Sequence, residues 1–110
     1  MLHDSDFVKI RVMVPVDIAD KMRQVLGDNG AGIMGKYEYA SGSWRQTGRF
    51  RGMPGSNPAV GKPGQLEEVE EEVIETLCHK DKVEQVIEAV RKAHPYEEPP
   101  IDIIPRYEVE

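Results

Sequence analysis

The chain has 110 residues, 14 of them basic and 20 acidic, and a formal net charge of −6. This length suits one domain spanning residues 1–110 rather than two independent cores. The acidic balance argues against nucleic-acid binding, and no apolar stretch reaches the length of a membrane-spanning helix. The single cysteine, Cys78, excludes an internal disulfide, and the first residues lack the features of a signal peptide. We therefore expect a cytoplasmic protein with neither nucleic acid nor membrane as partner.

The first quarter of the chain predicts a strand followed by a helix. Phe7–Val14 alternates apolar and basic residues, as a half-buried strand does, and Pro15 ends it. Asp17 is a candidate N-cap for a helix whose apolar residues recur at helical spacing from Ile18 to Leu26. Asn29-Gly30 then provides the stop signal.

The middle of the chain is unusual because all ten glycines lie between Gly27 and Gly64. Within this glycine-rich middle, Tyr37–Ser41 and Thr47–Arg51 are expected to be short or irregular extended pieces. Met53–Gly64, with three prolines and three glycines, predicts an ordered loop or a mobile flap.

The second half of the chain begins with an ambiguous segment, Leu66–Cys78. Its apolar spacing and six glutamates narrowly favour a helix, although as a strand it would place Val69, Val73 and Leu77 on one face. Lys80–His94 predicts a clear helix with Asp81 and Glu84 as a possible capping box. Ile101–Val109 alternates like a closing strand.

Two glycine motifs fail as nucleotide-binding loops. Gly30–Gly35 matches G-x-G-x-x-G, but it follows a helix and precedes an extended segment, which is the reverse of the dinucleotide-binding context. Gly55–Lys62 resembles a P-loop, but it has one residue too many between its glycines, and Pro63 replaces the magnesium-binding Ser or Thr. We expect Gly30–Gly35 to be a helix C-cap followed by a turn with positive φ.

Local positive charge marks the same region as a candidate anion site. The window from Tyr39 to Leu66 contains no acidic residue but has four basic ones, namely Arg45, Arg49, Arg51 and Lys62. Exposed backbone amides together with arginines could hold a phosphate, and the alternative is a solvated flap. The glutamates between Glu67 and Glu75 could pair with these arginines, within the chain or across a subunit contact.

The segment from His94 to Pro100 (His-Pro-Tyr-Glu-Glu-Pro-Pro) gathers the most functional-looking side chains. A histidine beside carboxylates could bind a divalent metal, with Glu97 or Glu75 as second ligand to His94. The alternative is a structural turn that fixes the last strand. Covalent catalysis is not indicated, because no base lies near Ser41, Ser43 or Cys78 in the sequence.

Several motifs in fixed order resemble the insert domain of the Nif-three-like (Ngg-interacting-factor-three-like) family. They are Gly30-Ala31-Gly32-x-x-Gly35-x-Tyr37, Gly48-x-Phe50, Gly55-x-Asn57-Pro58-x-x-Gly61, Val69-Glu70-Glu71, Ile74-Glu75 and His94-Pro95-Tyr96-Glu97-Glu98-Pro99. The match covers nearly the whole chain, which suggests a free-standing version of that insert. The insert is similar in fold to PII signalling proteins and to CutA.

The resemblance implies a ferredoxin-like α+β fold, βαββαβ, with two helices on one face of an antiparallel sheet. It turns Leu66–Cys78 into a central strand, on which Glu71 and Glu75 would need partners if their face is covered. It also implies a homo-oligomer, with a trimer favoured and a dimer possible. The family's metal ligands lie in flanking segments, so no residue here inherits that role, and Ala40 stands where the family commonly has a cysteine.

The functional hypothesis that follows is a non-enzymatic binding or regulatory module, which binds a small anion or nucleotide between subunits. Its candidate ligand-binding residues are Gly30, Gly32, Gly35, Tyr37, Arg45, Arg49, His94, Tyr96 and Glu97. The alternatives are a divalent-metal-binding protein that uses His94 and Glu97, an interaction module that docks on a separately encoded metal-enzyme core, and a small hydrolase with weak activity. No cofactor is expected beyond such a metal.

Overall fold

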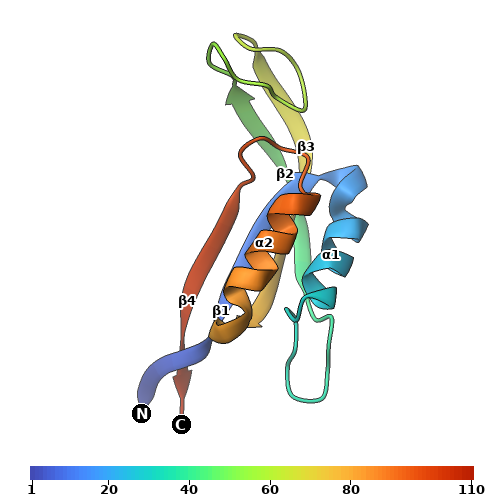
Figure 1. Ribbon diagram of the computed structural model, residues 1–110. Helices are drawn as coiled ribbons and strands as arrows, with labels where there is room; N and C mark the ends of the chain where they lie inside the picture. The colour runs from blue at the N-terminus through green and yellow to red at the C-terminus, as the bar shows by residue number, and fades with distance from the viewer.

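Four antiparallel strands form one sheet, and two helices cover one of its faces (Figure 1). The computed structural model describes all of residues 1–110. In chain order the elements are β1 (Leu2–Pro15), α1 (Ala19–Asp28), β2 (Gly42–Arg51), β3 (Leu66–His79), α2 (Val83–Ala93) and β4 (Ile101–Val109). The strand order across the sheet is β2-β3-β1-β4. This arrangement is the predicted ferredoxin-like α+β fold.

The two central strands decide which residues enter the core. Val12 of β1 lies opposite Ile74 of β3, and residues directly opposite in an antiparallel pair share a face. Both side chains are fully buried beneath the helices. The core cluster is completed by alternate residues of the two strands and by the apolar sides of both helices, and its members are Val8, Ile10, Val12, Val14, Ala19, Met22, Leu26, Ala31, Ile74, Cys78, Val86, Ile87 and Val90.

The other face of the sheet carries no helix, and we call it the open face. Arg11, Glu75 and Asp102 lie on it in neighbouring strands, as their pairing shows. Trp44 of β2 lies opposite Val73 of β3. The guanidinium of Arg11 lies over the Trp44 ring, 5.3 Å from the ring centroid. The open face is therefore a mixed polar surface, in contrast to the apolar core side.

Segment 66–79 is a strand, so the helix that the apolar pattern narrowly favours is wrong and the strand implied by the family resemblance is confirmed. It pairs with β1 on one side and with β2 on the other along most of its length. Pairing on both sides and burial of Ile74 and Cys78 outweigh the helix propensity of the glutamates. The glutamates alternate between the two faces instead of forming a solvated helix side.

Three local predictions are also corrected. Tyr37–Ser41 is a loop rather than an extended piece, and the strand β2 begins after it, at Gly42. Asp17 does not cap a helix, because it lies within a 3-10 turn, Val16–Ile18, that precedes α1. The Asp81 and Glu84 capping box does not form either, since the His79 side chain accepts the hydrogen bond from the Asp81 backbone N–H in the turn before α2.

The strands are longer than the helices, so the sheet extends beyond them at both ends. A strand of 14 residues, such as β3, reaches about 45 Å, whereas the 11 residues of α2 span about 16 Å. The molecule accordingly measures 51 × 26 × 23 Å. The hairpin of β2 and β3 projects past the helices at one end, and the termini lie at the other (Figure 1). Neither helix is long and apolar enough to cross a membrane.

Replacing Ile74 with alanine tests the assigned core. We expect Ile74→Ala to lower the free energy of unfolding by about 2–5 kcal/mol, because the cavity it leaves is surrounded by fully buried neighbours. Urea unfolding followed by circular dichroism measures the change. The control is Ile103→Ala, since Ile103 is 50% exposed on β4 and its loss costs little. Equal effects of the two changes would contradict the register of β3.

Candidate functional site

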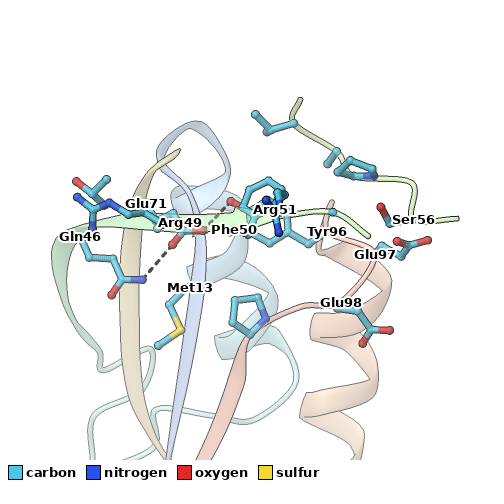
Figure 2. A pocket seen from close by; sticks show the side chains of 17 residues that line it. Met13, Gln46, Arg49, Phe50, Arg51, Ser56, Glu71, Tyr96, Glu97 and Glu98 are labelled. Atoms are coloured by element: carbon cyan, nitrogen blue, oxygen red, sulfur yellow. Dashed lines mark hydrogen bonds between the residues drawn. The ribbon is translucent and has the colours of Figure 1, made fainter. Parts of the chain in front are cut away.

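A cavity of about 580 Å³ lies where the projecting hairpin meets the segment that joins α2 to β4. Figure 2 shows it with the side chains around it. Its walls come from β1, β2, β3, the loop after β2 and the segment 96–100. The lining residues are Met13, Gln46, Thr47, Gly48, Arg49, Phe50, Arg51, Gly52, Ser56, Pro58, Ala59, Val60, Glu71, Tyr96, Glu97, Glu98 and Pro100. Its size is that of cavities which hold small organic ligands.

His94 fixes the segment that forms one wall. Its Nδ1 accepts a hydrogen bond from the Tyr96 backbone N–H at 3.1 Å, so the ring proton is on Nε2, which donates to the Met13 carbonyl at 2.7 Å. The backbone N–H of Met13 also donates to the Pro100 carbonyl. Both ends of the segment are therefore tied to β1. Burial lowers the pKa of His94, because it disfavours the charged ring.

Glu71 forms the buried polar floor of the cavity. It is 6% exposed and accepts hydrogen bonds from the Tyr96 hydroxyl at 2.7 Å and from the Gln46 side-chain amide at 3.0 Å (Figure 2). Burial, followed by the contact with Glu71, raises the pKa of Tyr96, so the phenol remains a donor. Gly48 provides the space, since a Cβ there would stand 2.2 Å from the Glu71 carboxylate. A glycine inside a strand commonly marks such a close approach.

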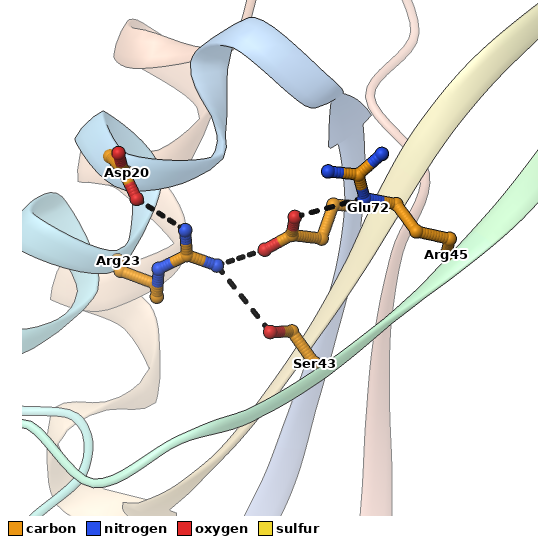
Figure 3. A network of polar contacts seen from close by, with 5 residues as sticks. All are labelled: Asp20, Arg23, Ser43, Arg45 and Glu72. Carbon is orange, nitrogen blue, oxygen red and sulfur yellow. Dashed lines mark hydrogen bonds and ion pairs between the residues drawn. The ribbon is translucent and has the colours of Figure 1, made fainter.

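Two other glutamates of β3, Glu72 and Glu75, differ from Glu71 because they are paired with cations. Glu75 contacts Lys9 and Arg11, at 2.9 and 2.7 Å, and these bonds lower its pKa. Glu72 contacts Arg23 of α1 first and Arg45 of β2 second, and its pKa is lowered as well (Figure 3). None of the ion pairs in the structure includes Glu71. The predicted pairing of these glutamates with arginines of the glycine-rich middle is confirmed for Arg45 with Glu72 and Arg49 with Glu68, whereas Glu67, Glu70 and Glu71 take part in no ion pair.

Two arginines give the cavity positive charge. Arg49 pairs with Glu68 across the hairpin at 3.2 Å, and both side chains are largely exposed. Arg51 is exposed and takes part in no ion pair or side-chain hydrogen bond. Glu97, on the facing segment, accepts a hydrogen bond from the Asn57 backbone N–H at 3.0 Å and so links the loop after β2 to that segment. The cavity is therefore lined by three carboxylates, Glu71, Glu97 and Glu98, and has at its edge one guanidinium, that of Arg51, without an ion pair.

The structure divides the candidate ligand-binding residues of the sequence into two groups. Arg49, Tyr96 and Glu97 line the cavity, and His94 lies directly behind it. The other group, Gly30, Gly32, Gly35 and Tyr37, lies in the loop after α1, at the opposite end of the helical layer (Figure 1). Arg45 lies between them and bonds Glu72. One chain does not bring the two groups together, so a shared pocket needs a second subunit.

The loop after α1 has the local geometry that its glycines predict. Gly30, Gly32 and Gly35 all have positive φ, at 101°, 83° and 56°. A Cβ on Gly32 would stand 2.7 Å from the Ala40 carbonyl oxygen, so glycine is required there for space as well as conformation. The helix C-cap and turn expected from Gly30–Gly35 are therefore confirmed.

The metal alternative finds no prepared ligand set. Both ring nitrogens of His94 are already engaged, and Glu75 is held by two basic side chains. Glu97 bonds the loop after β2 instead of turning to His94. The structure contains no group of three His, Cys, Asp or Glu side chains arranged to hold a metal ion. The hypothesis that His94 and Glu97 bind metal stays a prediction, and this geometry favours the structural alternative for the segment.

Sequence reasoning left Gly48 and Glu71 out of the candidate ligand-binding residues, although both line the cavity. Gly48 entered only as part of a family motif, and Glu71 only within such a motif and as a strand residue that would need a partner, whereas Arg51 was named among the basic residues of the candidate anion site. Glu71 pairs with Gln46 and its side chain reaches the space beside Gly48, and both facts depend on a register that one sequence does not reveal. The available signal was a glycine within a predicted strand, which often indicates a close approach.

Curated sequences similar to this chain carry the name GTP cyclohydrolase 1 type 2 homolog. The protein from Halalkalibacterium halodurans is 43% identical over 97 residues, which make up 88% of this chain and 26% of that protein. The protein from Bacillus subtilis is 39% identical over the same shares. The chain thus spans about a quarter of the length of the curated relatives it matches. No model of a known protein family matches the chain.

Solved structures support the same relationship and the fold. A Bacillus cereus protein related to NIF3 superposes with a TM-score of 0.76 at 38% identity, over 96% of this chain and 26% of that one. CutA from Archaeoglobus fulgidus, described as a periplasmic divalent cation tolerance protein, superposes with a TM-score of 0.66 at 18% identity, over 91% and 83%. The likeness to CutA concerns the fold alone.

Acid weakens the fold through His94 in the interval below neutral pH. Because its folded pKa is lowered, the unfolded chain takes up a proton first, and stability falls as the pH drops from about 6.5 toward the folded value. One such group contributes a slope of at most about 1.4 kcal/mol per pH unit. The lowered pKa values of Glu72 and Glu75 affect stability only at more acidic pH, below the ordinary pKa of a glutamate.

Urea unfolding at a series of pH values measures this dependence of stability on pH, and His94→Gln is expected to reduce its slope. An unchanged slope in that variant would contradict the assignment.

Adding a methyl group at Gly48 tests the close approach to Glu71. Gly48→Ala is expected to lower the free energy of unfolding by about 1–3 kcal/mol, because the carboxylate has to shift from its two donors. Gly42→Ala is the matched control on the same strand, since a Cβ there meets nothing within 4 Å. Thermal unfolding of both variants measures the difference, and a neutral Gly48→Ala would show that Glu71 does not lie against β2.

Proposed function

This chain is homologous to one segment of the Nif-three-like proteins and has a CutA-like fold, and from that premise we propose that it is a non-enzymatic ligand-binding or regulatory module. Its ligand is a small anion or a nucleotide. The site is the cavity between the projecting hairpin and the segment 94–100. The loop after α1 of a neighbouring subunit completes it.

The observation that carries this proposal is the unpaired cation at a cavity of ligand size. Arg51 has no acidic partner in the structure, although the following strand contains six glutamates. Arg49 adds a second guanidinium that is already shared with Glu68. Guanidinium groups bind phosphate and carboxylate through paired N–H donors, so an anion is the natural occupant beside them.

Self-association is part of the proposal, with a trimer favoured and a dimer possible. The strands β2 and β4 are the edges of the sheet and leave backbone groups without a partner strand. On the open face Trp44 is 45% exposed. A neighbouring subunit at these edges would cover them and could bring Gly32 and Tyr37 toward the cavity of the first. Analytical ultracentrifugation tests this, since a 12.4 kDa species at all concentrations would contradict it.

The name of the relatives suggests which nucleotide to examine first. They are called homologues of a GTP cyclohydrolase, and the chain matches about a quarter of them. We assign no reaction to the chain, because the hydroxyls that line its cavity, Thr47 and Ser56, donate to the Glu70 carboxylate and to the Met53 carbonyl, and no group of three metal-binding side chains is present. GTP is therefore proposed as a ligand and not as a substrate.

A second candidate function is an interaction module that docks on a metal-enzyme core. The observation in its favour is that this chain matches about a quarter of each relative, whereas about three quarters of the relative's own sequence lies outside the match. Co-purification of this chain with a protein similar to that remaining part would support docking, and separate elution of the two would reject it.

Arg51 provides the test of anion binding. The wild-type chain is expected to bind GTP and inorganic tripolyphosphate in titration calorimetry, and Arg51→Ala to weaken both by about tenfold or more, because a hydrogen bond to a charged group contributes about 1.5–3 kcal/mol. Arg91→Ala is the control, since Arg91 is an exposed arginine of α2 outside this cavity. Equal weakening by both changes would indicate general attraction of anions, and absence of binding by the wild type would reject the proposal.

A further inference from the structure

We propose that Glu71 binds the part of the ligand that donates hydrogen bonds through N–H groups, while the anionic part lies near Arg51. The ligand class is therefore an anion whose body carries an ammonium group or a pair of neighbouring N–H donors. This inference rests on the proposed function, because it concerns the same cavity.

The charge of Glu71 is the first argument. On the same strand, Glu72 and Glu75 each have two basic partners, although both keep more access to water than Glu71 does. Glu71 is the most buried of the three and has only two uncharged donors, a phenol and an amide. A buried carboxylate without a cation is unfavourable unless something else compensates its lost hydration.

The geometry around Glu71 is the second argument. Each carboxylate oxygen can accept two hydrogen bonds, and here each accepts one, from Gln46 on one oxygen and from Tyr96 on the other. The two donors hold the carboxylate in a fixed orientation, and the missing side chain at Gly48 gives it room. The group also lines the cavity, so one acceptor position on each oxygen remains for a ligand.

The arrangement of opposite charges in one cavity is the third argument. Glu71 lies on the floor, whereas the exposed Arg51 extends from the end of β2 (Figure 2). These two side chains do not pair with each other, so each is left to a ligand group of the opposite sign. A ligand that bridges them must be amphoteric: it carries N–H donors at one end and a phosphate or carboxylate at the other. A cavity of about 580 Å³ accommodates a molecule of this kind.

Two pairs of probes separate the possible sources of the N–H donors. GTP presents two neighbouring N–H groups on its base, and inosine triphosphate lacks the exocyclic amine. O-phosphoethanolamine carries an ammonium group, and ethyl phosphate lacks it. Titration calorimetry on the intact chain compares the members of each pair. We expect the donor-bearing member of at least one pair to bind about tenfold more tightly than its counterpart, or better, which is the contribution of one hydrogen bond to a charged group.

The variant Glu71→Gln identifies the residue responsible. It keeps the size of the side chain and an acceptor for the Tyr96 hydroxyl, and it removes the charge. We expect it to abolish the preference within the pair while the counterpart binds as before, and to leave the melting temperature equal or higher. The matched control is Glu70→Gln, because Glu70 is the adjacent carboxylate and does not line the cavity. That variant should keep the wild-type preference.

The outcomes distinguish this inference from the proposed function. If the wild-type chain binds both members of each pair equally, and Arg51→Ala weakens them, anion binding stands and the role of Glu71 is wrong. A preference that survives in Glu71→Gln also overturns it. If none of the four probes binds, both proposals are rejected. Comparing the two members of each probe pair on the wild-type chain tests the donor preference even where a variant does not fold.

Discussion

At the centre of the sheet Val12 of β1 lies opposite Ile74 of β3. This register determines the face of the sheet on which each of the remaining residues of the two strands lies. A slip by one residue would exchange the faces and bring Glu71 and Glu75 under the helices. The register is held because the even-numbered residues of both strands pack into one apolar core. The open face can then carry charge, and both the ion pairs of Glu75 and the cavity at Glu71 depend on that arrangement.

The same register explains which parts of the fold were predictable from the sequence. The strand at Phe7–Val14 and the closing strand at Ile101–Val109 were predicted correctly, because alternation of side chains is a local pattern. Both helices were predicted to within a few residues for the same reason, since their apolar stripes are regular. Segment 66–79 was not, because its glutamates favour a helix locally and only the pairing with strands on both sides makes it a strand. The family resemblance supplied this non-local information.

The candidate site was predictable only in part. Tyr96 and Glu97 were selected from a conspicuous segment, and they do line the cavity. Glu71 looked like one of six similar glutamates, and its distinction arises from contacts that are far apart in the sequence. Gly32 and its neighbours have the positive φ values that their sequence predicts, whereas their contact with a ligand stays a prediction. A sequence pattern thus identifies residues with an unusual backbone conformation more readily than residues whose side-chain contacts come from distant parts of the chain.

The central claim is that a donor-bearing anion occupies the cavity between Glu71 and Arg51. A crystal structure of the chain grown with GTP tests it most directly. We expect electron density in this cavity, with the N–H edge of the base on the Glu71 carboxylate and the phosphates toward Arg51. Density at the loop around Gly32 alone, with the cavity free of nucleotide, would contradict it.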